Sequence, residues 1–441
     1  MRHRFVVAAT AGFMLGVACA ADAPSIDPGS VTLEKQGSFA VVTYRLDGAP
    51  AIVTVDIQTN TLDNGAGEWV SIGGENVRTL SGEVNKIVRG TEATHQFRWK
   101  ANTDFPNQMI KTSRIRAELT AWATNAPPDY MVVGLRQQND VRFYASTNFL
   151  PGGFFDNRYK TTELLMRKIP AAGVVWRMGS PVDEDPGNVN EKEEVCRLVM
   201  LTEDYYMAVY PTTQSQYTNM CTVSANQPWP DEEGAELMPM GNLTHVKLRG
   251  DGVWPQLGHE DVSSDSVIGQ LRTNSGLDGF DLPTEAQWEY ACRAGTDSAF
   301  NNGTSASEAN SKAVGWTSAN STSVQVGSST RRIFHPVGLK EGNAYGLYDM
   351  HGSVQESCLD RAASGDDVAG LLVSDYAKGG VTVDPIGPSD WSVGAENRCV
   401  RRGGSAHHGW HNSRAGAHGY GTYNGNYYYN GFRVWHPARF K

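Results

Sequence analysis

Histidine is concentrated near the C-terminal end of the chain, where it could supply metal ligands. Four of the eleven histidines fall within twelve residues, at His407, His408, His411 and His418. Imidazole is the commonest transition-metal ligand, so His408 with His411 or His418 could bind zinc, copper or iron. No carboxylate lies between Ser405 and Asn430, however, and no helical spacing presents the rings together. A polar loop packed across the surface explains the same pattern, and both interpretations stay open here.

The same segment is rich in tyrosine, whose flat amphipathic ring can stack on a sugar or on a peptide side chain. Asparagine, histidine and arginine nearby would add directional hydrogen bonds. The residues expected to contact such a ligand are Trp410, Tyr420, Tyr423, Asn424, Tyr427 and Arg433. The expected partner is therefore a peptide or a glycan.

Other catalytic patterns are absent from the sequence. There is no G-x-S-x-G elbow, phosphate-binding G-x-x-x-x-G-K loop, H-E-x-x-H zinc motif or dinucleotide fingerprint. One acidic stretch, which could hold calcium, consists of Asp183, Glu184, Asp185, Glu191, Glu193 and Glu194. We expect it to be a solvated run of charge.

The first twenty residues have the pattern of a secretory signal peptide. Arg2 and Arg4 precede an apolar run, and small residues at Ala18 and Ala20 suit cleavage. We expect a secreted or periplasmic protein with an extracytoplasmic partner. Acylation of Cys19 would make it a lipoprotein, but Gly16 occupies a position where such signals usually carry leucine. No later apolar segment is long enough to span a membrane, so no integral span is expected.

Length, charge and cysteine content narrow the class further. A chain of 441 residues corresponds to two or three domains. Its net charge is -10, with no basic block, which excludes a typical nucleic-acid-binding protein. The cysteines after the signal are Cys196, Cys221, Cys292, Cys358 and Cys399. Most of them are expected to be small buried hydrophobic residues, with room for at most two disulfides.

In the segment from about Ser25 to Ala126, polar and apolar residues alternate along the chain. Val53, Val55 and Ile57 alternate with polar residues, as strands with one buried face require. The segment 47–50 is expected to be a hairpin turn. Several short strands over about a hundred residues favour an all-β sandwich like immunoglobulin or fibronectin type III modules. Trp99 and Trp122 are expected to be core or edge aromatics in it.

Short helices in Gly- and Asn-rich surroundings are expected after the break at 125–129. Thr284 with Gln287 forms a predicted capping box, and Gly295 is its predicted left-handed stop. Thr213 and Gln216 repeat the pattern. Both helices are expected to serve as scaffold.

The blocks that follow resemble the sulfatase-modifying factor family, which includes the formylglycine-generating enzymes. The chain reads LPTEAQWEYACRAGT over 282–296, NAYGLYDMHG over 343–352, RGGS over 402–405 and GFRV over 431–434. An upstream block contains IPAAG at 169–173 and MGS at 178–180. The resemblance covers about 160–437. It implies an irregular α+β fold related to C-type lectins.

The resemblance also implies a chemistry that this chain lacks the residues to perform. Formylglycine-generating members hold copper with two cysteines, at the third and eighth positions after the serine of RGGS. Counted from Ser405, those positions are His408 and Ser413. A thiolate pair selects Cu(I), whereas an imidazole and a hydroxyl do not, so copper is not expected. The prediction is a non-oxidase member that binds or scaffolds; the alternative is an oxidoreductase using a histidine-rich metal centre.

A structural calcium ion is the last feature that the resemblance implies. Members carry GNVWEW after the DMHG block, with an Asn and a Glu as ligands. Here Ser353 replaces the Asn and Glu356 is kept, so these two are candidate calcium ligands. The predicted organisation is a signal peptide (1–20), a β-sandwich module (21–126), a linker (127–159) and a family domain (160–441).

Overall fold

The computed structural model describes most of the chain beyond the signal region. The described residues are 23–90, 92, 94–109, 111–185, 194, 196–250, 262–362, 380–386 and 398–441. The predicted signal peptide lies outside them, as do Glu191 and Glu193 of the acidic stretch.

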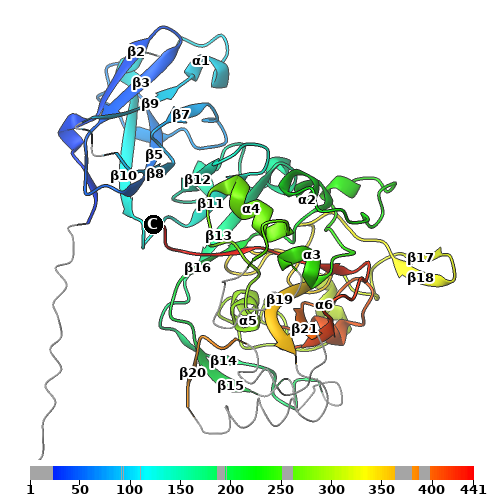
Figure 1. The fold of residues 1–441 in the computed structure, drawn as a ribbon. Coiled ribbons are helices and arrows are strands. Elements are labelled where there is room, and N and C mark those ends of the chain that lie inside the picture. The colour runs from blue at the N-terminus through cyan, green and yellow to red at the C-terminus, as the bar shows by residue number, and fades with distance from the viewer. Residues whose placement is uncertain are drawn as a thin grey trace, which may run out of the picture.

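Two antiparallel sheets form the N-terminal part of the molecule (Figure 1). The first has the order β10–β5–β6, with β8 also paired to β5. Its strands are β5 (Ala51–Asn60), β6 (Trp69–Ser71), β8 (Lys86–Val88) and β10 (Ile115–Ala123). The second has the order β2–β3–β9–β7. Its strands are β2 (Thr32–Gln36), β3 (Phe39–Tyr44), β7 (Leu80–Gly82) and β9 (His95–Trp99).

These two sheets share one hydrophobic core. Its buried members come from both of them: Val42, Tyr44, Val53, Val55, Ile57, Phe97, Trp99, Ile115 and Ala117. The predicted alternation along β5 is thereby confirmed, because its odd-numbered apolar residues face this core. Trp99 is a core aromatic as expected, and the half-buried Trp122 donates its Nε1 proton to Oγ1 of Thr54 at 2.9 Å.

The hairpin predicted at 47–50 is wrong. The preceding β4 (Leu46–Asp47) pairs with β1 (Ser25–Ile26), and the following β5 pairs with β6, β8 and β10. The chain therefore crosses here from one sheet to the other. Both β3 and β5 bury an apolar face, but they do so on opposite walls of the same core.

A five-stranded antiparallel sheet with the order β12–β11–β13–β16–β24 forms the centre of the second part. Its strands are β11 (Tyr130–Gly134), β12 (Val141–Tyr144), β13 (Glu163–Ile169), β16 (Tyr205–Ala208) and β24 (Trp435–Pro437). The predicted linker, 127–159, therefore contributes two strands, which Figure 1 places between the N-terminal sheets and the rest. Every residue of β11 is buried, so this strand has no polar alternation to reveal it.

Two smaller sheets and a hairpin complete the described strands. The sheets have the orders β14–β15–β20 and β22–β21–β19–β23, and β17 pairs with β18 in the hairpin that projects in Figure 1. The strands are β14 (Val175–Met178), β15 (Arg197–Met200), β17 (Ser323–Val326), β18 (Ser329–Arg332), β19 (Gln355–Ala362), β20 (Thr382–Val383), β21 (Arg398–Arg402), β22 (Gly419–Thr422) and β23 (Asn430–Gly431).

The helices of the described residues are short. They are α1 (Ala101–Asp104), α2 (Gln214–Met220), α3 (His245–Arg249), α4 (Val267–Ser275), α5 (Glu285–Arg293) and α6 (Glu308–Val314). Single 3-10 turns are η1 (Pro28–Ser30), η2 (Thr112–Arg114), η3 (Thr147–Phe149), η4 (Asn157–Lys160), η5 (Ala235–Leu237) and η6 (Trp410–Ser413). The fold is thus a mixed α and β structure made mostly of sheets.

Both predicted capping boxes are present. Oγ1 of Thr284 accepts from the backbone N–H of Gln287, whose Oε1 accepts from the backbone N–H of Thr284. The same reciprocal pair starts α2. The left-handed end of α5 falls on Ala294, at φ 46°, and Gly295 follows it at φ 92°. The predicted stop was therefore one residue late.

The cysteines after residue 195 are all free thiols in the structure, and Cys292, Cys358 and Cys399 are buried. This confirms small buried residues for three of the five. Among the described residues, no helix has the length and apolar character needed to cross a bilayer.

Candidate ligand-binding site

The histidine- and tyrosine-rich segment follows strand β21 of the sheet β22–β21–β19–β23. Strand β21 ends at Arg402 and is followed by Gly403 and Gly404, with φ of 85° and 64°, which lead into Ser405. A Cβ on Gly404 would lie 2.7 Å from the carbonyl oxygen of Asn412. Glycine is therefore needed where the chain turns out of the strand and folds back on itself.

A buried ion-pair network ties β21 to α5. The guanidinium of Arg402 lies 2.7 Å from Glu289 and 2.8 Å from Glu285. Glu289 also accepts hydrogen bonds from Nε of Arg293 and from the backbone N–H of Gly179, each at 2.8 Å. Burial alone raises the pKa of Glu289, but Arg293 and Arg402 outweigh burial and hold it below its usual value. The sheet that carries the segment is thus fixed by paired charges.

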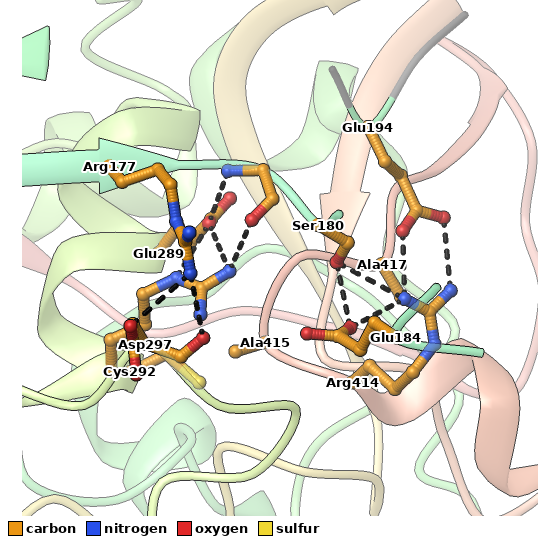
Figure 2. A network of polar contacts seen from close by, with 12 residues as sticks. Arg177, Ser180, Glu184, Glu194, Glu289, Cys292, Asp297, Arg414, Ala415 and Ala417 are labelled. Atoms are coloured by element: carbon orange, nitrogen blue, oxygen red, sulfur yellow. Dashed lines mark hydrogen bonds and ion pairs between the residues drawn. The ribbon is translucent and has the colours of Figure 1, made fainter. Parts of the chain in front are cut away.

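A second network holds the segment itself, through Arg414 (Figure 2). The Arg414 guanidinium is nearly fully buried and binds both oxygens of Glu194, at 2.9 and 3.1 Å. It also donates to Glu184 at 2.9 Å and to Oγ of Ser180 at 3.1 Å, and its Nε lies 3.5 Å from Asp185. The expected solvated run of charge is therefore wrong for these three acidic residues. A buried guanidinium requires counter-charges, and the acidic stretch supplies them.

The four clustered histidines have four separate partners. Nδ1 of His411 lies 2.8 Å from Asp185, and Nδ1 of His418 lies 2.6 Å from Glu285. Nδ1 of His408 lies 2.7 Å from Oγ of Ser405, and His407 contacts the hydroxyl of Tyr428. No three acidic, histidine or cysteine side chains in the described ranges are grouped so as to hold a metal. The predicted ligand set His408, His411 and His418 is thus not brought together, and the metal stays a prediction.

His408 and Ser413, the positions at which the resemblance led us to expect cysteines, are enclosed by hydrogen bonds. Burial, with His407 and Arg401, lowers the pKa of His408 to about 4. Ser413 is buried; its hydroxyl donates to the carbonyl of Trp410, and its own carbonyl accepts from Nδ1 of His351 at 2.7 Å. These groups are therefore engaged in holding the segment in place.

One thiol lies beneath the segment. Sγ of Cys292 lies 3.7 Å from Nε2 of His351, which accepts from the backbone N–H of Asn301. Burial raises the pKa of Cys292 well above its usual value, so this sulfur is a neutral thiol. The sequence predicted Cys292 only as a buried residue and gave His351 no role, although both lie in the family blocks.

Of the two candidate calcium ligands, Glu356 is already bonded to a cationic side chain. Both oxygens of Glu356 accept from Arg433, at 2.7 and 2.8 Å, and one of them also accepts from Nε1 of Trp288 at 2.6 Å. A cation beside this carboxylate would face a guanidinium. The hydroxyl of Ser353 and Oδ1 of Asp349 are buried, and neither has a hydrogen-bond partner among the described residues. Glu356 therefore does not fit as a calcium ligand in this arrangement.

The predicted contact set divides into buried and accessible members. Arg433 is fully buried, and Tyr423 is buried with its hydroxyl donating to the carbonyl of Gly250 at 2.8 Å. Both serve the interior of the fold. Asn424 is exposed, and Trp410 is half-buried and stacks on His411 with 3.8 Å between ring centroids.

The two exposed tyrosines of the set lie on opposite faces of one sheet. Tyr420 pairs with Val400 in the register of β21 and β22, and Arg398 lies over its ring. Tyr427 has Arg401 over its ring, 5.8 Å from the centroid. Val400 and Arg401 are consecutive residues of β21, so their side chains point to opposite faces.

A column of parallel rings dominates the face that carries Arg401. His407 stacks on Tyr429 with centroids 5.0 Å apart, and Tyr429 stacks on Tyr427 at 5.5 Å, each with an interplanar angle of 12°. His408 meets Tyr429 edge-on at 4.8 Å. We call His407, Tyr429, Tyr427 and Arg401 the aromatic column. Sequence reasoning included only Tyr427 among its contacts; the run of three tyrosines was the available signal for Tyr429.

A hairpin from elsewhere in the chain supports the column. The hydroxyl of Tyr428 accepts from the backbone N–H of Arg332 at 2.9 Å. The guanidinium of Arg331 lies 5.2 Å from the centroid of the same ring. Tyr428 is itself buried, and its ring stacks on Phe334. Strand β18 thus adds two arginines beside the column.

Comparison with solved structures finds similar proteins at low identity, among them the following three. The Treponema denticola variable protein 1 is 20% identical, with 62% of this chain and 95% of that chain covered and a TM-score of 0.42. PvdO from Pseudomonas aeruginosa is 19% identical, with 62% and 94% covered and a TM-score of 0.43. CarF is 17% identical, with 62% and 97% covered and a TM-score of 0.35.

Comparison with curated proteins and with family models identifies the family of the chain. A chaperone protein named LppX from Paenibacillus barcinonensis is 32% identical over 105 residues, which are 22% of this chain. The match spans only 37% of that relative's length. The model of the sulfatase-modifying factor enzyme 1-like domain matches residues 138–437, and so includes β12 from the predicted linker. With about two thirds of its length matched, this chain belongs to the sulfatase-modifying factor enzyme 1-like domain family.

Proposed function

We propose that this chain is an exported binding protein of the family, and that its aromatic column recognises an extended peptide. The observation that carries the proposal is the column itself, in which three rings stand parallel at the surface. Side chains of this kind present much contact area with few rotatable bonds, so they lose little entropy on binding.

The way the rings are covered favours a peptide over a glycan. Tyr429 stacks on both His407 and Tyr427, and Arg401 lies over the ring of Tyr427. A pyranose ring needs a free aromatic face on which to stack. Rings stacked on one another have less free face for a sugar, and their hydroxyls suit the amide groups and side chains of an extended chain.

Charge around the column favours acidic residues in the peptide. Arg331 and Arg332 lie beside the column on β18 and are half-buried, whereas Arg401 is buried and donates to backbone carbonyls. The segment between Ser405 and Asn430 contains no carboxylate. Arginine binds carboxylates with paired hydrogen bonds, so Asp or Glu in the peptide would add affinity and increase the association rate.

The groups at the two ligand positions agree with a protein that binds a peptide without copper-dependent oxidation of a cysteine. His408 and Ser413 cannot provide a thiolate pair, and the thiol of Cys292 is buried and neutral. Export is proposed from the first twenty residues, and an extracytoplasmic peptide is the corresponding partner.

Peptide-library selection on the full chain, followed by fluorescence anisotropy with selected peptides, tests the proposal. We expect Tyr427→Ala to weaken binding at least tenfold, which corresponds to about 1.4 kcal/mol. Tyr420→Ala is the matched control, because Tyr420 is equally exposed and also lies under an arginine, but on the opposite face of the sheet. Equal losses in the two variants, or selective binding on a glycan array only, would overturn the proposal.

Metal analysis of untagged protein separates this function from the metal-dependent alternative. We expect no stoichiometric copper, zinc or iron, and no oxygen consumption with cysteine-containing peptides. Stoichiometric metal that is lost in a His408→Ala, His411→Ala variant would establish the oxidoreductase alternative instead.

A further inference from the structure

A hollow of about 270 Å³ lies at the end of the N-terminal sheets where Figure 1 labels α1. Strands β2 and β3, with the turn between them, form one wall, and the segment from α1 to η2 forms the other. Ile115, the first residue of β10, lines the hollow from the opposite sheet. The hollow therefore opens at one end of the core that the two sheets share.

The interior of the hollow is apolar because the core continues into it. Lys35, Ala40 and Trp99 are register partners across β2, β3 and β9, so their side chains lie on one face of the sheet. Trp99 belongs to the shared core, so this face is the inner one. Leu33, Ala40 and Ala101 pack against the same core, but each is only half-buried. Their side chains therefore leave apolar surface accessible inside the hollow.

A single charged side chain, that of Lys35, lines the hollow. No group in the described residues forms an ion pair or a hydrogen bond with its ammonium. Glu34 is adjacent in β2, but its side chain points to the opposite face. Asp104 of α1 is engaged elsewhere, because its Oδ2 accepts from Nε1 of Trp99 at 2.8 Å and from a backbone N–H at 2.9 Å. An accessible apolar wall beside an unpaired cation fits a ligand that has an apolar chain and a negative charge.

We propose that this hollow binds a medium-chain alkyl carboxylate. The carboxylate pairs with the ammonium of Lys35 and accepts hydrogen bonds from the exposed amides of Asn102 and Gln108, while the alkyl chain packs on the apolar wall. Drug-sized pockets start at about 300 Å³, so the chain is limited to about eight carbon atoms. The site precedes the segment that matches the family model and does not depend on the aromatic column.

Isothermal titration calorimetry on the full chain tests the site with octanoate, and n-octanol and n-octylamine are controls of matched length. We expect octanoate to bind about tenfold more tightly than n-octanol, because only the carboxylate forms charged hydrogen bonds with Lys35. The amine should bind more weakly than either. Hexanoate should bind about fourfold more weakly than octanoate for each methylene removed, since the chain is buried.

A lysine variant tests the charged contact. Lys35→Gln should lower the affinity for octanoate to that for n-octanol and leave the affinity for n-octanol unchanged. Lys86→Gln is the matched control, because Lys86 is an exposed lysine on β8 of the opposite sheet and should not affect either ligand. Equal affinities for octanoate in the wild type and in Lys35→Gln, or equal affinities for octanoate and n-octylamine, would refute the carboxylate site.

A second variant tests whether the alkyl chain enters the hollow. Ala101→Leu places a larger side chain in the wall, so it should abolish binding of both octanoate and n-octanol while the melting temperature stays unchanged. Octanoate binding that survives in a stable Ala101→Leu protein would show that the chain lies elsewhere. If Ala101→Leu lowers the melting temperature, the Lys35→Gln comparison decides alone, because Lys35 is exposed and its replacement leaves the core intact.

Discussion

At the scale of single residues, the structure gives several predicted ligand residues a role in the interior. Arg433 was expected to touch a ligand, yet its guanidinium pairs with both oxygens of Glu356 in the core. The acidic stretch, expected to be solvated, is likewise paired with Arg414 in the interior. A sequence shows that an arginine is present but not whether it lies at the surface, because burial depends on partners distant in the chain.

Arg433→Met is expected to destabilise the protein by about 3 to 5 kcal/mol, because it leaves Glu356 charged and buried without its partner. Arg439→Met is the control. Arg439 is 66% exposed and pairs with Glu203 at the surface, so its loss should cost less than about 1 kcal/mol. Urea unfolding measures both, and similar losses would contradict the assignment of Arg433 to the core.

Stability is expected to fall with pH below neutrality because of His351. Burial lowers the pKa of His351 from 6.5 to about 4, so the folded state resists protonation while the unfolded state accepts it. The contribution is complete above pH 6.5 and is lost as the pH falls from 6.5 to 4, by up to about 3 kcal/mol. Urea unfolding at successive pH values measures it. A stability that is flat between pH 7 and 5 would contradict a neutral buried His351.

At the scale of elements, local signals were reliable and pairings were not. The capping boxes of α2 and α5 and the alternation along β5 follow from a few adjacent residues, and the structure confirms them. The turn at 47–50 was misread because its residues favour a turn without saying which strands it joins. Strand β11 was missed because a fully buried strand has no alternation.

Thr284→Ala is expected to cost about 1 kcal/mol, because the backbone N–H of Gln287 loses its acceptor at the start of α5. Thr284→Ser keeps the hydroxyl and should stay close to the wild type. Thermal unfolding of the three proteins tests this. Equal destabilisation by Ala and Ser would mean that the methyl group, rather than the cap, matters at this position.

At the scale of the whole molecule, the N-terminal sheets and the family domain share a core. Ile52 lies on β5, yet its side chain is fully buried in a cluster with Met131 and Phe143 from β11 and β12. The family blocks contribute Leu282, Phe432 and Val434 to this cluster, but nothing in their sequence indicates that a residue of β5 packs there. The blocks did predict the family and its mixed α and β fold, because their identities are specific.

Ile52→Ala is expected to cost about 2 to 5 kcal/mol and to increase hydrogen exchange in β11 and β12 as well as in β5. Val55→Ala is the matched control, since Val55 belongs to the core cluster between the two N-terminal sheets. Its effect should stay within those sheets. Exchange that rises in β5 alone for both variants would show that the two parts unfold independently.

The division between anchoring and surface residues in the C-terminal segment has a consequence for how this protein can change. Arg402, Arg414 and Arg433 are locked inside the fold, whereas His407, Asn424 and Tyr427 project into solvent. Mutations at the projecting positions are expected to alter what the protein recognises while its melting temperature stays nearly constant. The projecting residues can therefore be varied by selection in the laboratory to change what the protein recognises. The buried arginines keep the segment folded while they vary.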